Sequence, residues 1–538
     1  MNKLPIIERA SFSRGFKRNS ERSRRAPFFV LSTAIIILFL VIAGRLFQLT
    51  VVKGDYYRRL SDENRIREIV IEPKRGTIYD RYKRVIASNK PPDYKDPGDY
   101  IKSSRTYEGG NAIGHLIGYR AVADKNDIEN DDCLAALVLG DRTGKKGVEE
   151  AFDCELRGRR GKKLIELDAL GREKKTLGLI PPVSGRDLTL ALDMTLQRRA
   201  YELIEATASA RAAVIATHPK TGELLVMAAV PSYNPQDFEN NNQKMMEHYL
   251  TAANHPLFNR ATEGTYPPGS IFKLIVAAGA LEDKKIDEKT LIEDTGFVKV
   301  GPAVYNNWYY TDYGRTEGQV NIIKALQRSN DIFFYKTGEK MGEGRIKHWS
   351  EHMGLGEAVN FPLHQSNGII PSPFWKEKQL GETWFTGDTF NFSIGQGYTL
   401  TTPLQMHQAS VAFAAKEPTI CDPQLIKGAY PTCRKINLSK QTIDIIRRGM
   451  RAACEDGGTA YPFFDFQVNG KKISTGCKTG TAESQNPKET KPHAWFTVFA
   501  PYENPEILVT VLVENSGQGS EIAAPIAKEI LKTYFEQR

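Results

Sequence analysis

Ser270 and Lys273 stand three residues apart in the stretch GTYPPGSIFKLIVAAGALE, and their surroundings favour nucleophilic chemistry. Pro267-Pro268-Gly269 ends the preceding segment, and the residues from Ser270 onward predict a helix that is apolar on nearly every side, as in a core. Lys273 lies one turn from Ser270 on the same face. Burial lowers the pKa of a lysine, so that its neutral amine can take the proton of a neighbouring hydroxyl. The spacing therefore predicts a serine nucleophile with a lysine base; the alternative is an N-cap serine beside an unrelated lysine.

Two further motifs contain residue types that such a site needs. Ser329-Asn330-Asp331 falls within NIIKALQRSNDIFFYKTGEKMG, which has helical spacing. Lysine-threonine-glycine occurs three times, beginning at Lys220, Lys336 and Lys478. The first falls in a predicted hairpin turn and the second on the predicted helix. The third lies between the strand-like segments KKISTGC and AWFTVFAP, where an extended edge can hold a peptide.

In this order, Ser270-x-x-Lys273, Ser329-x-Asp331 and Lys478-Thr479-Gly480 resemble the active-site set of penicillin-binding proteins and serine β-lactamases. Other segments resemble the class B branch, the monofunctional transpeptidases, over residues ~45 to 535. These segments are RGTIYDR (75–81), YPPGS (266–270), W-x-x-GDT-x-N-x-SIGQG (384–397) and TPLQ (402–405).

The resemblance implies a peptidoglycan D,D-transpeptidase that is inhibited covalently by β-lactams and needs no cofactor. Ser270 would attack the penultimate D-Ala carbonyl of a stem peptide while Lys273 takes its proton. Ser329 and Lys478 would relay that proton to the leaving D-Ala, and an amine of a second stem peptide would then attack the acyl-enzyme.

The resemblance also assigns residues that bind the substrate. Lys478-Thr479-Gly480-Thr481 would lie along the donor peptide, with the hydroxyls of Thr479 and Thr481 near its carboxylate. The backbone N–H groups of Ser270 and Thr481 would form the oxyanion hole.

Two departures from the family pattern carry information. Position 331 is Asp where most relatives have Asn, and this Asp, like HAWFTVFAP (493–501), resembles the elongation-type, penicillin-binding protein 2 group. The segment after RGTIYDR is short, so a subdomain that many relatives carry there is reduced. Some relatives hold a metal between the first two motifs, but residues 271–328 contain no His or Cys, and we predict no metal.

The elements that must position these residues follow a membrane segment. The net charge is +9, but residues 1–25 hold eight basic and two acidic side chains, so the body is near neutral, which excludes a nucleic-acid-binding surface. Residues 26–44 are free of charge and, with those up to 48, predict one membrane-spanning helix about 35 Å long. The positive-inside rule places residues 1–25 in the cytoplasm and everything after about residue 49 outside. We therefore expect a single-pass protein of the bacterial cytoplasmic membrane, and exclude a cleaved signal peptide and a buried helix.

The rest of the chain predicts two further domains. Residues 49–187 combine a helical stem, short strands and Gly-rich turns, as in a β-rich pedestal (dimerisation-type) domain. Residues 188–538 have strand signals at both ends, helical spacing between them and a last helix, which predicts an α+β domain. The family gives this domain the serine β-lactamase/penicillin-binding transpeptidase fold, an antiparallel sheet with a helical subdomain. It also implies partners: a SEDS-family glycan polymerase and elongation-complex scaffold proteins.

The six cysteines give one prediction. Cys421 and Cys433 lie close in sequence in a domain expected to face an oxidising compartment, so a disulfide between them is one interpretation. Unpaired buried thiols are the other.

Other functions fit the motifs less well. A division-type class B transpeptidase stays as an alternative, as does a membrane-anchored D,D-carboxypeptidase. A diffusible β-lactamase needs neither the span nor the pedestal. A β-lactam sensor would place several spans before its sensor domain, and a bifunctional polymerase needs another domain of ~200 residues before Ser270.

Overall fold

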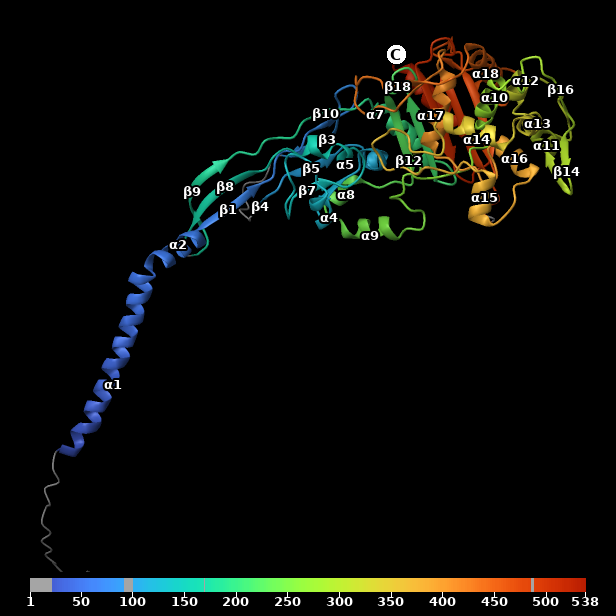
Figure 1. The fold of residues 1–538 in the computed structure, drawn as a ribbon. Coiled ribbons are helices and arrows are strands. Elements are labelled where there is room, and N and C mark those ends of the chain that lie inside the picture. The colour runs from blue at the N-terminus through green and yellow to red at the C-terminus, as the bar shows by residue number, and fades with distance from the viewer. Residues whose placement is uncertain (1–21, 91–99, 169, 485–487) are drawn as a thin grey trace, which may run out of the picture. The chain divides into compact units, whose positions relative to one another are not determined.

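The computed structural model describes residues 22–90, 100–168, 170–484 and 488–538 (Figure 1). They form two compact units. Among the described residues the first unit contains 22–70 and Lys162–Ile180, and the second contains Ile71–Gly161 and Pro181–Arg538. All eight predicted site residues lie in the second unit.

The first unit begins with a long apolar helix. α1 (Arg22–Phe47) continues through a π-helical turn (Gln48–Val52) before α2 (Gly54–Arg65). Of the described residues, Pro27–Val52 is the one helix long and apolar enough to cross a membrane, and its apolar side chains are exposed rather than packed in a core. The predicted apolar N-terminal helix is thereby confirmed. The unit also holds three neighbouring strands, β1 (Ile66–Ile71), β8 (Gly161–Leu167) and β9 (Glu173–Ile180).

Residues 71–161 of the second unit form a module of short elements. Its strands β2 (Ile78–Tyr79), β3 (Val85–Lys90) and β5 (Ser104–Tyr107) form a four-stranded sheet with β10 (Leu188–Thr189), which follows the module in sequence. The order is β10-β2-β3-β5. A hairpin of β6 (Arg120–Val122) and β7 (Arg142–Gly144) and four short helices complete it. The helices have four or five residues each, too few to give the 3.6-residue periodicity by which a helix is recognised in sequence. They are α3 (Gly114–Ile117), α4 (Lys125–Glu129), α5 (Gly147–Ala151) and α6 (Asp153–Arg157).

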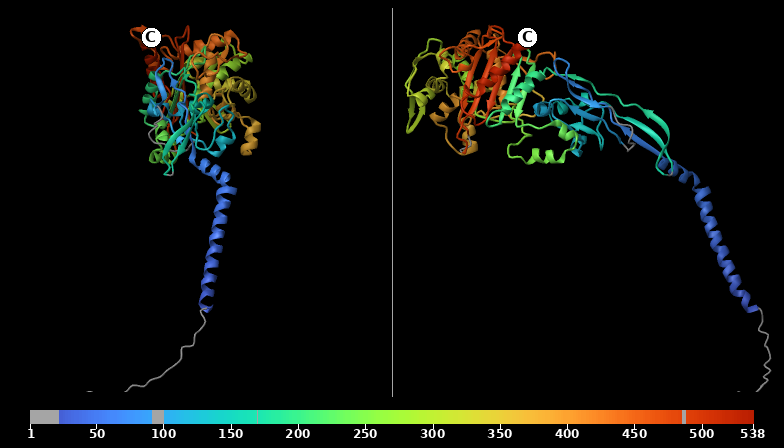
Figure 2. Two further views of the ribbon diagram at one scale, coloured as in Figure 1. Left: turned by 90° about the vertical axis from the view of Figure 1, so that its left-hand side faces the viewer. Right: turned by 180° about the vertical axis from the view of Figure 1, so that it is seen from behind.

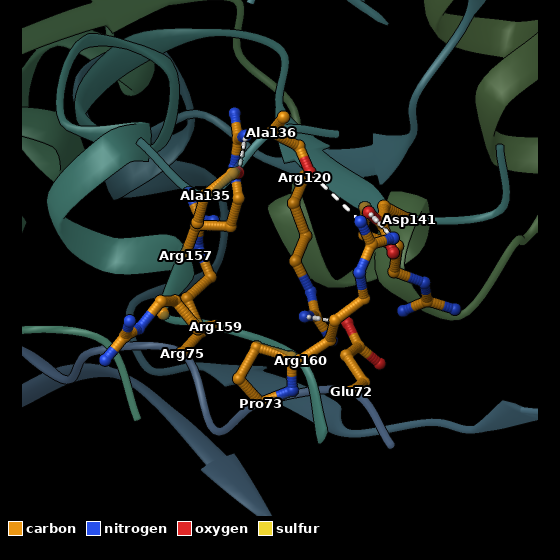
Figure 3. A pocket seen from close by; sticks show the side chains of 12 residues that line it. Glu72, Pro73, Arg75, Arg120, Ala135, Ala136, Asp141, Arg157, Arg159 and Arg160 are labelled. Atoms are coloured by element: carbon orange, nitrogen blue, oxygen red, sulfur yellow. Dashed lines mark hydrogen bonds and ion pairs between the residues drawn. The ribbon is translucent and has the colours of Figure 1, made fainter. Parts of the chain in front are cut away.

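Buried arginines paired with carboxylates hold the 71–161 module together. Glu149 is fully buried and accepts hydrogen bonds from the guanidinium groups of Arg75 and Arg105. Arg120 pairs with Glu72 and, on α8 (Pro235–Glu239), with Glu239. The second pair fastens the module to the segment that follows the hairpin of residues 212–230. Arg75 and Arg120 also line a cavity of about 230 Å³, whose side chains Figure 3 shows.

A five-stranded antiparallel sheet lies at the centre of the part of the second unit that follows residue 188, called the large domain below. The strand order is β12 (Leu224–Val230), β11 (Ala212–Thr217), β23 (Ile507–Val513), β22 (His493–Ala500) and β21 (Gly476–Ala482). Strands from the two ends of the chain therefore lie side by side, green beside orange and red in the right panel of Figure 2. β21, which contains Lys478, is the edge strand, as the sequence predicted.

Helices cover both faces of this sheet. The alternation of side chains along β23 sends Val509 and Val511 to one face and Leu508 and Leu512 to the other. On the first face, α7 (Met194–Glu205) and α19 (Ala523–Glu536) complete one core. The second face packs against a larger helical layer. Its helices include α10 (Lys273–Glu282), α12 (Ile322–Arg328), α13 (Asp331–Met341), α14 (Glu343–His352), α17 (Pro403–Ala414) and α18 (Lys440–Ala453).

The helix expected over residues 321–341 is two helices. α12 ends at Arg328, and α13 begins at Asp331. Ser329 between them has φ +53° and ψ +38°, a left-handed conformation that stops a helix. Asn330 then caps α13, its side chain accepting from the backbone N–H of Phe333. The prediction was wrong because apolar spacing continues across a break made by one backbone conformation.

All six cysteines form disulfides. Cys421–Cys433 joins two paired strands, so the disulfide interpretation is confirmed and the unpaired thiols are excluded. Two further pairs escaped the sequence analysis. Cys133–Cys154 lies in the 71–161 module, and Cys454–Cys477 ties the end of α18 to β21, one residue before Lys478.

Candidate active site

Lys273 is completely buried at the first turn of α10. Its Nζ donates to Asp331 Oδ1 at 2.6 Å and to the backbone oxygen of Ser329 at 2.8 Å. The helix is buried along nearly its whole length, so Lys273 has no path to solvent along α10. The sequence predicted a buried lysine at this helix start, and the structure adds the carboxylate of Asp331 as its partner.

Ser329 lies between two lysines. Its Oγ is 2.8 Å from Lys478 Nζ, which donates to it, and 3.4 Å from Lys273 Nζ. The break between α12 and α13 allows this, because the left-handed residue turns its side chain and carbonyl toward the start of α10. The three groups form a continuous hydrogen-bonded chain, Lys273–Ser329–Lys478.

Asp331 is fixed by two neighbours as well as by Lys273. Its Oδ2 accepts from the backbone N–H of Trp308 at 3.0 Å, and its own N–H donates to Asn307 Oδ1 at 3.1 Å. Asn330, the middle residue of the motif, points elsewhere, because its side chain caps α13 and donates to Asp294. The carboxylate that faces Lys273 therefore belongs to position 331 and is held in place from both sides.

The edge strand β21 brings the third motif to the same place. Lys478 is fully buried. Gly480 packs against β22 and the turn at Ser270, and a Cβ there would lie 2.8 Å from Trp495 Cβ and 3.0 Å from Ile271. The glycine is thus required by packing as well as by access to the backbone. Thr479 shares a 2.8 Å hydrogen bond with Thr459, while Thr481 is exposed at the end of the strand.

Ser270 lies in the 3₁₀ turn Gly269–Ile271, immediately before α10. Gly269 has φ +55°, and a Cβ on it would lie 2.7 Å from the carbonyl oxygen of Thr481. The residues on either side of Ser270 therefore lie against Gly480 and Thr481. The Ser270 side chain is partly exposed, and no hydrogen bond joins it to another residue that the structure describes. A hydroxyl in this position is free to react.

Burial dominates the charge state of the two lysines. Removal from water lowers the pKa of Lys273, although the neighbouring carboxylate of Asp331 acts in the opposite direction. The pKa of Lys478 is lowered further, first by burial and then by the positive charge of Lys273. With two buried amines and one carboxylate nearby, the neutral form of a lysine is favoured. A lysine must be neutral to act as a base.

The other two Lys-Thr-Gly sequences lie elsewhere, as predicted. Lys220 is in the turn between β11 and β12, where it hydrogen-bonds Asn504. Lys336 is on α13 and pairs with Glu339. Within the described ranges no group of three or more His, Cys, Asp or Glu residues could hold a metal ion.

Four residues around the site were missed by the sequence analysis. Asn307 and Trp308 orient Asp331, Thr459 binds Thr479, and Cys477 anchors the strand of Lys478 through its disulfide to Cys454. Each of these contacts joins residues about 20 positions apart in sequence, and helical or strand periodicity does not predict contacts of that kind. The Gly457-Gly458 pair predicts a turn just before Thr459, which is the one sequence signal near these four residues.

Comparisons with known proteins give the relatives of the whole chain. The family model described as penicillin binding protein transpeptidase domain matches residues 212–532, and that of the penicillin-binding protein dimerisation domain matches residues 100–190. The peptidoglycan D,D-transpeptidase MrdA of Acinetobacter baumannii is 30% identical over 97% of this chain and 89% of its own length. MrdA of Haemophilus influenzae is 28% identical over 94% and 90%. A solved complex between penicillin-binding protein PBP2 and MreC from Helicobacter pylori has a TM-score of 0.73 and 27% identity, and the match covers 87% of this chain and 99% of that one.

Proposed function

The chain belongs to the penicillin-binding protein transpeptidase family, and from this premise we propose that it cross-links peptidoglycan stem peptides through a serine acyl-enzyme during cell-wall elongation. The observation that carries the proposal is the buried chain Lys273–Ser329–Lys478, in which Lys273 pairs with Asp331. The chain lies one helical turn from Ser270, whose hydroxyl has no hydrogen-bond partner among the described residues. The elongation type rests on the similarity to MrdA and PBP2 proteins over most of the chain.

In acylation, Ser270 Oγ attacks the carbonyl carbon of the penultimate D-Ala. Neutral Lys273 takes the hydroxyl proton as the C–O bond forms, since burial lowers the pKa of Lys273 and so favours the neutral amine. The N–H groups of Ser270 and Thr481 bind the oxyanion. The C–N bond to the terminal D-Ala then breaks.

The leaving amine needs a proton, and Ser329 is placed to deliver it. Its hydroxyl accepts from Lys478 and lies 3.4 Å from the lysine that gained the proton. A proton can therefore pass from Lys273 or Lys478 through Ser329 Oγ to the departing nitrogen. In the second half-reaction the amine of another stem peptide attacks the ester carbonyl, and Ser270 recovers its proton as the ester bond breaks.

The donor peptide lies along β21. The edge strand offers its backbone between Lys478 and Thr481, and the exposed Thr481 hydroxyl with that of Thr479 receives the terminal carboxylate. A β-lactam enters the same place as a substrate mimic. When Ser270 opens its ring, the C–N bond breaks but the amine stays tethered to the acyl group and cannot leave the site.

The protein is anchored by one span, with residues 1–25 in the cytoplasm and the catalytic domain outside. The basic leader and the apolar helix support this orientation. A labelling experiment tests it: because all native cysteines are disulfide-bonded, a new cysteine at Ser104 or at Ser13 would be the one free thiol. An impermeant maleimide added to spheroplasts should label the first and not the second, and the reverse would overturn the orientation.

We expect two kinds of protein partner. A scaffold protein of the MreC kind fits because a similar PBP2 forms such a complex, and a SEDS-family glycan polymerase would supply the strands to be cross-linked. The peptides, β-lactams and the membrane complete the set of partners.

The decisive test is mass spectrometry of the product. Full-length protein in detergent, given a donor ending in D-Ala-D-Ala and an amine-bearing acceptor, should form a dimer that has lost one alanine. Ser270→Ala should form none. A product consisting only of donor shortened by one alanine would instead identify a D,D-carboxypeptidase.

A further inference from the structure

A cavity of about 420 Å³ lies at the end of α7, outside all three active-site motifs. Helix α9 (Gln243–Thr251), the end of β12 and the segments beside them form the rest of its wall. Neither half-reaction of the proposed transpeptidase uses the residues of this wall. Its polar lining includes Tyr201, Glu205, Asp237, His248, Tyr249 and Asn254.

The cavity wall combines tyrosine rings with carboxylates. Tyr201 donates to Glu205 Oε1 at 2.9 Å. Tyr249 donates to Asp237 Oδ2 at 2.6 Å, and Oδ1 of the same carboxylate accepts from Asn242. A carboxylate has about four acceptor positions, so both groups keep positions for a further donor. No lysine or arginine is among the described residues that line the cavity, and its negative charge therefore disfavours anions.

This lining suits a sugar. A neutral sugar carries many hydroxyl groups, and each can donate to a carboxylate as the two tyrosine hydroxyls already do. A tyrosine ring offers an apolar face together with a polar edge, as an amphipathic ligand requires. The cavity therefore has acceptors for hydroxyl groups beside apolar surface for the ring that carries them.

The register of the central sheet relates the cavity to the active site. Successive partners form one row across all five strands: Thr481, Ala494, Val513, Ala212 and Val230. Thr481 is at the active-site edge of the row, and Val230 at the other edge lines the cavity. Four strand spacings of about 4.8 Å place the two about 19 Å apart. The cavity and the active site thus lie at the same end of the sheet, on opposite edges.

The donor peptide runs toward this end of the sheet. In the proposed reaction its carbonyl is bound at Thr481 and its terminal carboxylate reaches back to Thr479, so its other residues continue past Ala482, the last residue of β21. Five extended residues span at most about 17 Å. A stem peptide of that length can bring the sugar at its other end close to the cavity.

We propose that this cavity binds a sugar of the glycan strand that carries the donor stem peptide. The inference rests on the proposed function, because the substrate of a peptidoglycan transpeptidase joins a peptide to a sugar. Once the sugar is bound, the attached peptide reaches Ser270 in an intramolecular step, and its effective concentration at the serine rises. The enzyme then favours a peptide on a glycan strand over the same peptide free in solution.

Two substitutions test the cavity without touching the acylation residues. Glu205→Gln removes the charge of one carboxylate, and His248→Ala removes an exposed ring from the wall. Each has a matched control on the same helix that is exposed and does not line the cavity. The controls are Glu202→Gln on α7 and Glu247→Ala on α9.

Cross-linking is measured with one donor peptide, either free or attached to a glycan fragment. Full-length wild-type protein in detergent should show a KM roughly tenfold lower for the glycan-linked donor, the gain expected from one or two hydrogen bonds to the sugar. Glu205→Gln and His248→Ala should each raise that KM roughly fivefold, the loss of one such bond. The KM for the free donor and acylation by a fluorescent penicillin should match wild type. Both controls should match wild type in all three assays.

Binding of the sugar is measured directly on protein whose Ser270 has been acylated by penicillin, which blocks the donor site. Isothermal titration calorimetry should detect a tetramer of N-acetylglucosamine, and Glu205→Gln should weaken its binding roughly fivefold. A tetramer of glucosamine carries ammonium groups in place of the acetamides. Tighter binding of this second tetramer would overturn the assignment, because the carboxylates would then select a cation.

Three further outcomes have distinct meanings. Equal KM values for the free and glycan-linked donors in the wild-type protein would overturn the inference while leaving the transpeptidase intact. An equal rise of both KM values in the cavity variants would also overturn it, because the cavity would then support the fold or the peptide rather than the sugar. A wild-type protein that forms no cross-linked dimer from either donor would overturn the proposed function itself.

Discussion

The second unit holds two groups of buried charges that differ in how they are matched. In the 71–161 module, Arg75 and Arg105 share Glu149, and Arg75 has Asp153 as a second partner. At the active site, Lys273 pairs with Asp331, and Lys478 donates to Ser329 and is reached only by the longer-range charge of Asp331. Both groups are equally removed from water, so burial does not distinguish them.

The number of counter-charges decides what each group does. In the module burial alone would raise the pKa of Glu149, but Arg105 and Arg75 outweigh it and lower that pKa. The pKa of Arg75 is raised for the same reason, although its burial acts in the opposite direction. At the active site burial prevails, and both lysine pKa values fall. In the module, each buried arginine has a carboxylate partner, so the charges stay ionised and stabilise the structure. At the active site there are more amines than carboxylates, so a lysine loses its proton more easily.

The largest expected effect is on the nucleophile. Ser270→Ala should abolish covalent labelling by a fluorescent β-lactam and leave the melting temperature unchanged, because the Ser270 side chain has no described partner to lose. Gel fluorescence and a thermal melt measure the two. Labelling at the wild-type rate would remove Ser270 from its role.

Glu149→Gln should instead reduce the stability of the fold. It leaves Arg105 buried without its counter-charge, which should cost about 3–5 kcal/mol of unfolding free energy. Glu155→Gln, on the exposed side of α6, is the control and should change stability by less than about 0.5 kcal/mol. Denaturant unfolding of the full-length protein measures both. Equal stability of the two variants would mean that the network is not matched as described.

Asp331→Asn tests the charge balance at the active site. The carboxylate raises the pKa of Lys273, so its removal should lower that pKa further. Acylation requires the neutral amine, and the acid limb of its pH profile should therefore move to lower pH. Asp312→Asn, on α11 (Trp308–Tyr313), should leave the limb in place. A limb unmoved in Asp331→Asn would show that position 331 does not sense Lys273, and a folded but inactive variant would show that the carboxylate itself takes part in the chemistry.

The smallest effect concerns Thr459, a positioning residue. Thr459→Val removes its 2.8 Å hydrogen bond to Thr479, which should raise KM for a carboxylate-bearing donor roughly fivefold, about 1 kcal/mol, with kcat little changed. Thr459→Ser should restore the wild-type KM. An equal loss of kcat in both variants would point to a structural role instead.

The sequence predicts the parts of this site that are close together along the chain, but not the contacts between residues far apart in sequence. Ser270 and Lys273 share one helix start, and Lys478 lies on a strand with turn residues around it, so spacing alone places them. The bend at Ser329 was missed because it depends on one backbone conformation. The ion pairs of Glu149 were not predictable, since they join residues 44 and 74 positions apart. Six cysteines allow fifteen pairings, and nearness in sequence identified one of the three pairs.

The pH dependence of acylation of the wild-type protein tests the central claim most directly. The second-order rate constant for a chromogenic penicillin would be measured from pH 5 to pH 10. If Lys273 is a base whose pKa burial has lowered, the rate should level off well below pH 10, the range in which an ordinary lysine loses its proton. A rate that rises tenfold per pH unit up to pH 10 would contradict the account, because the base would then be an unperturbed amine or hydroxide.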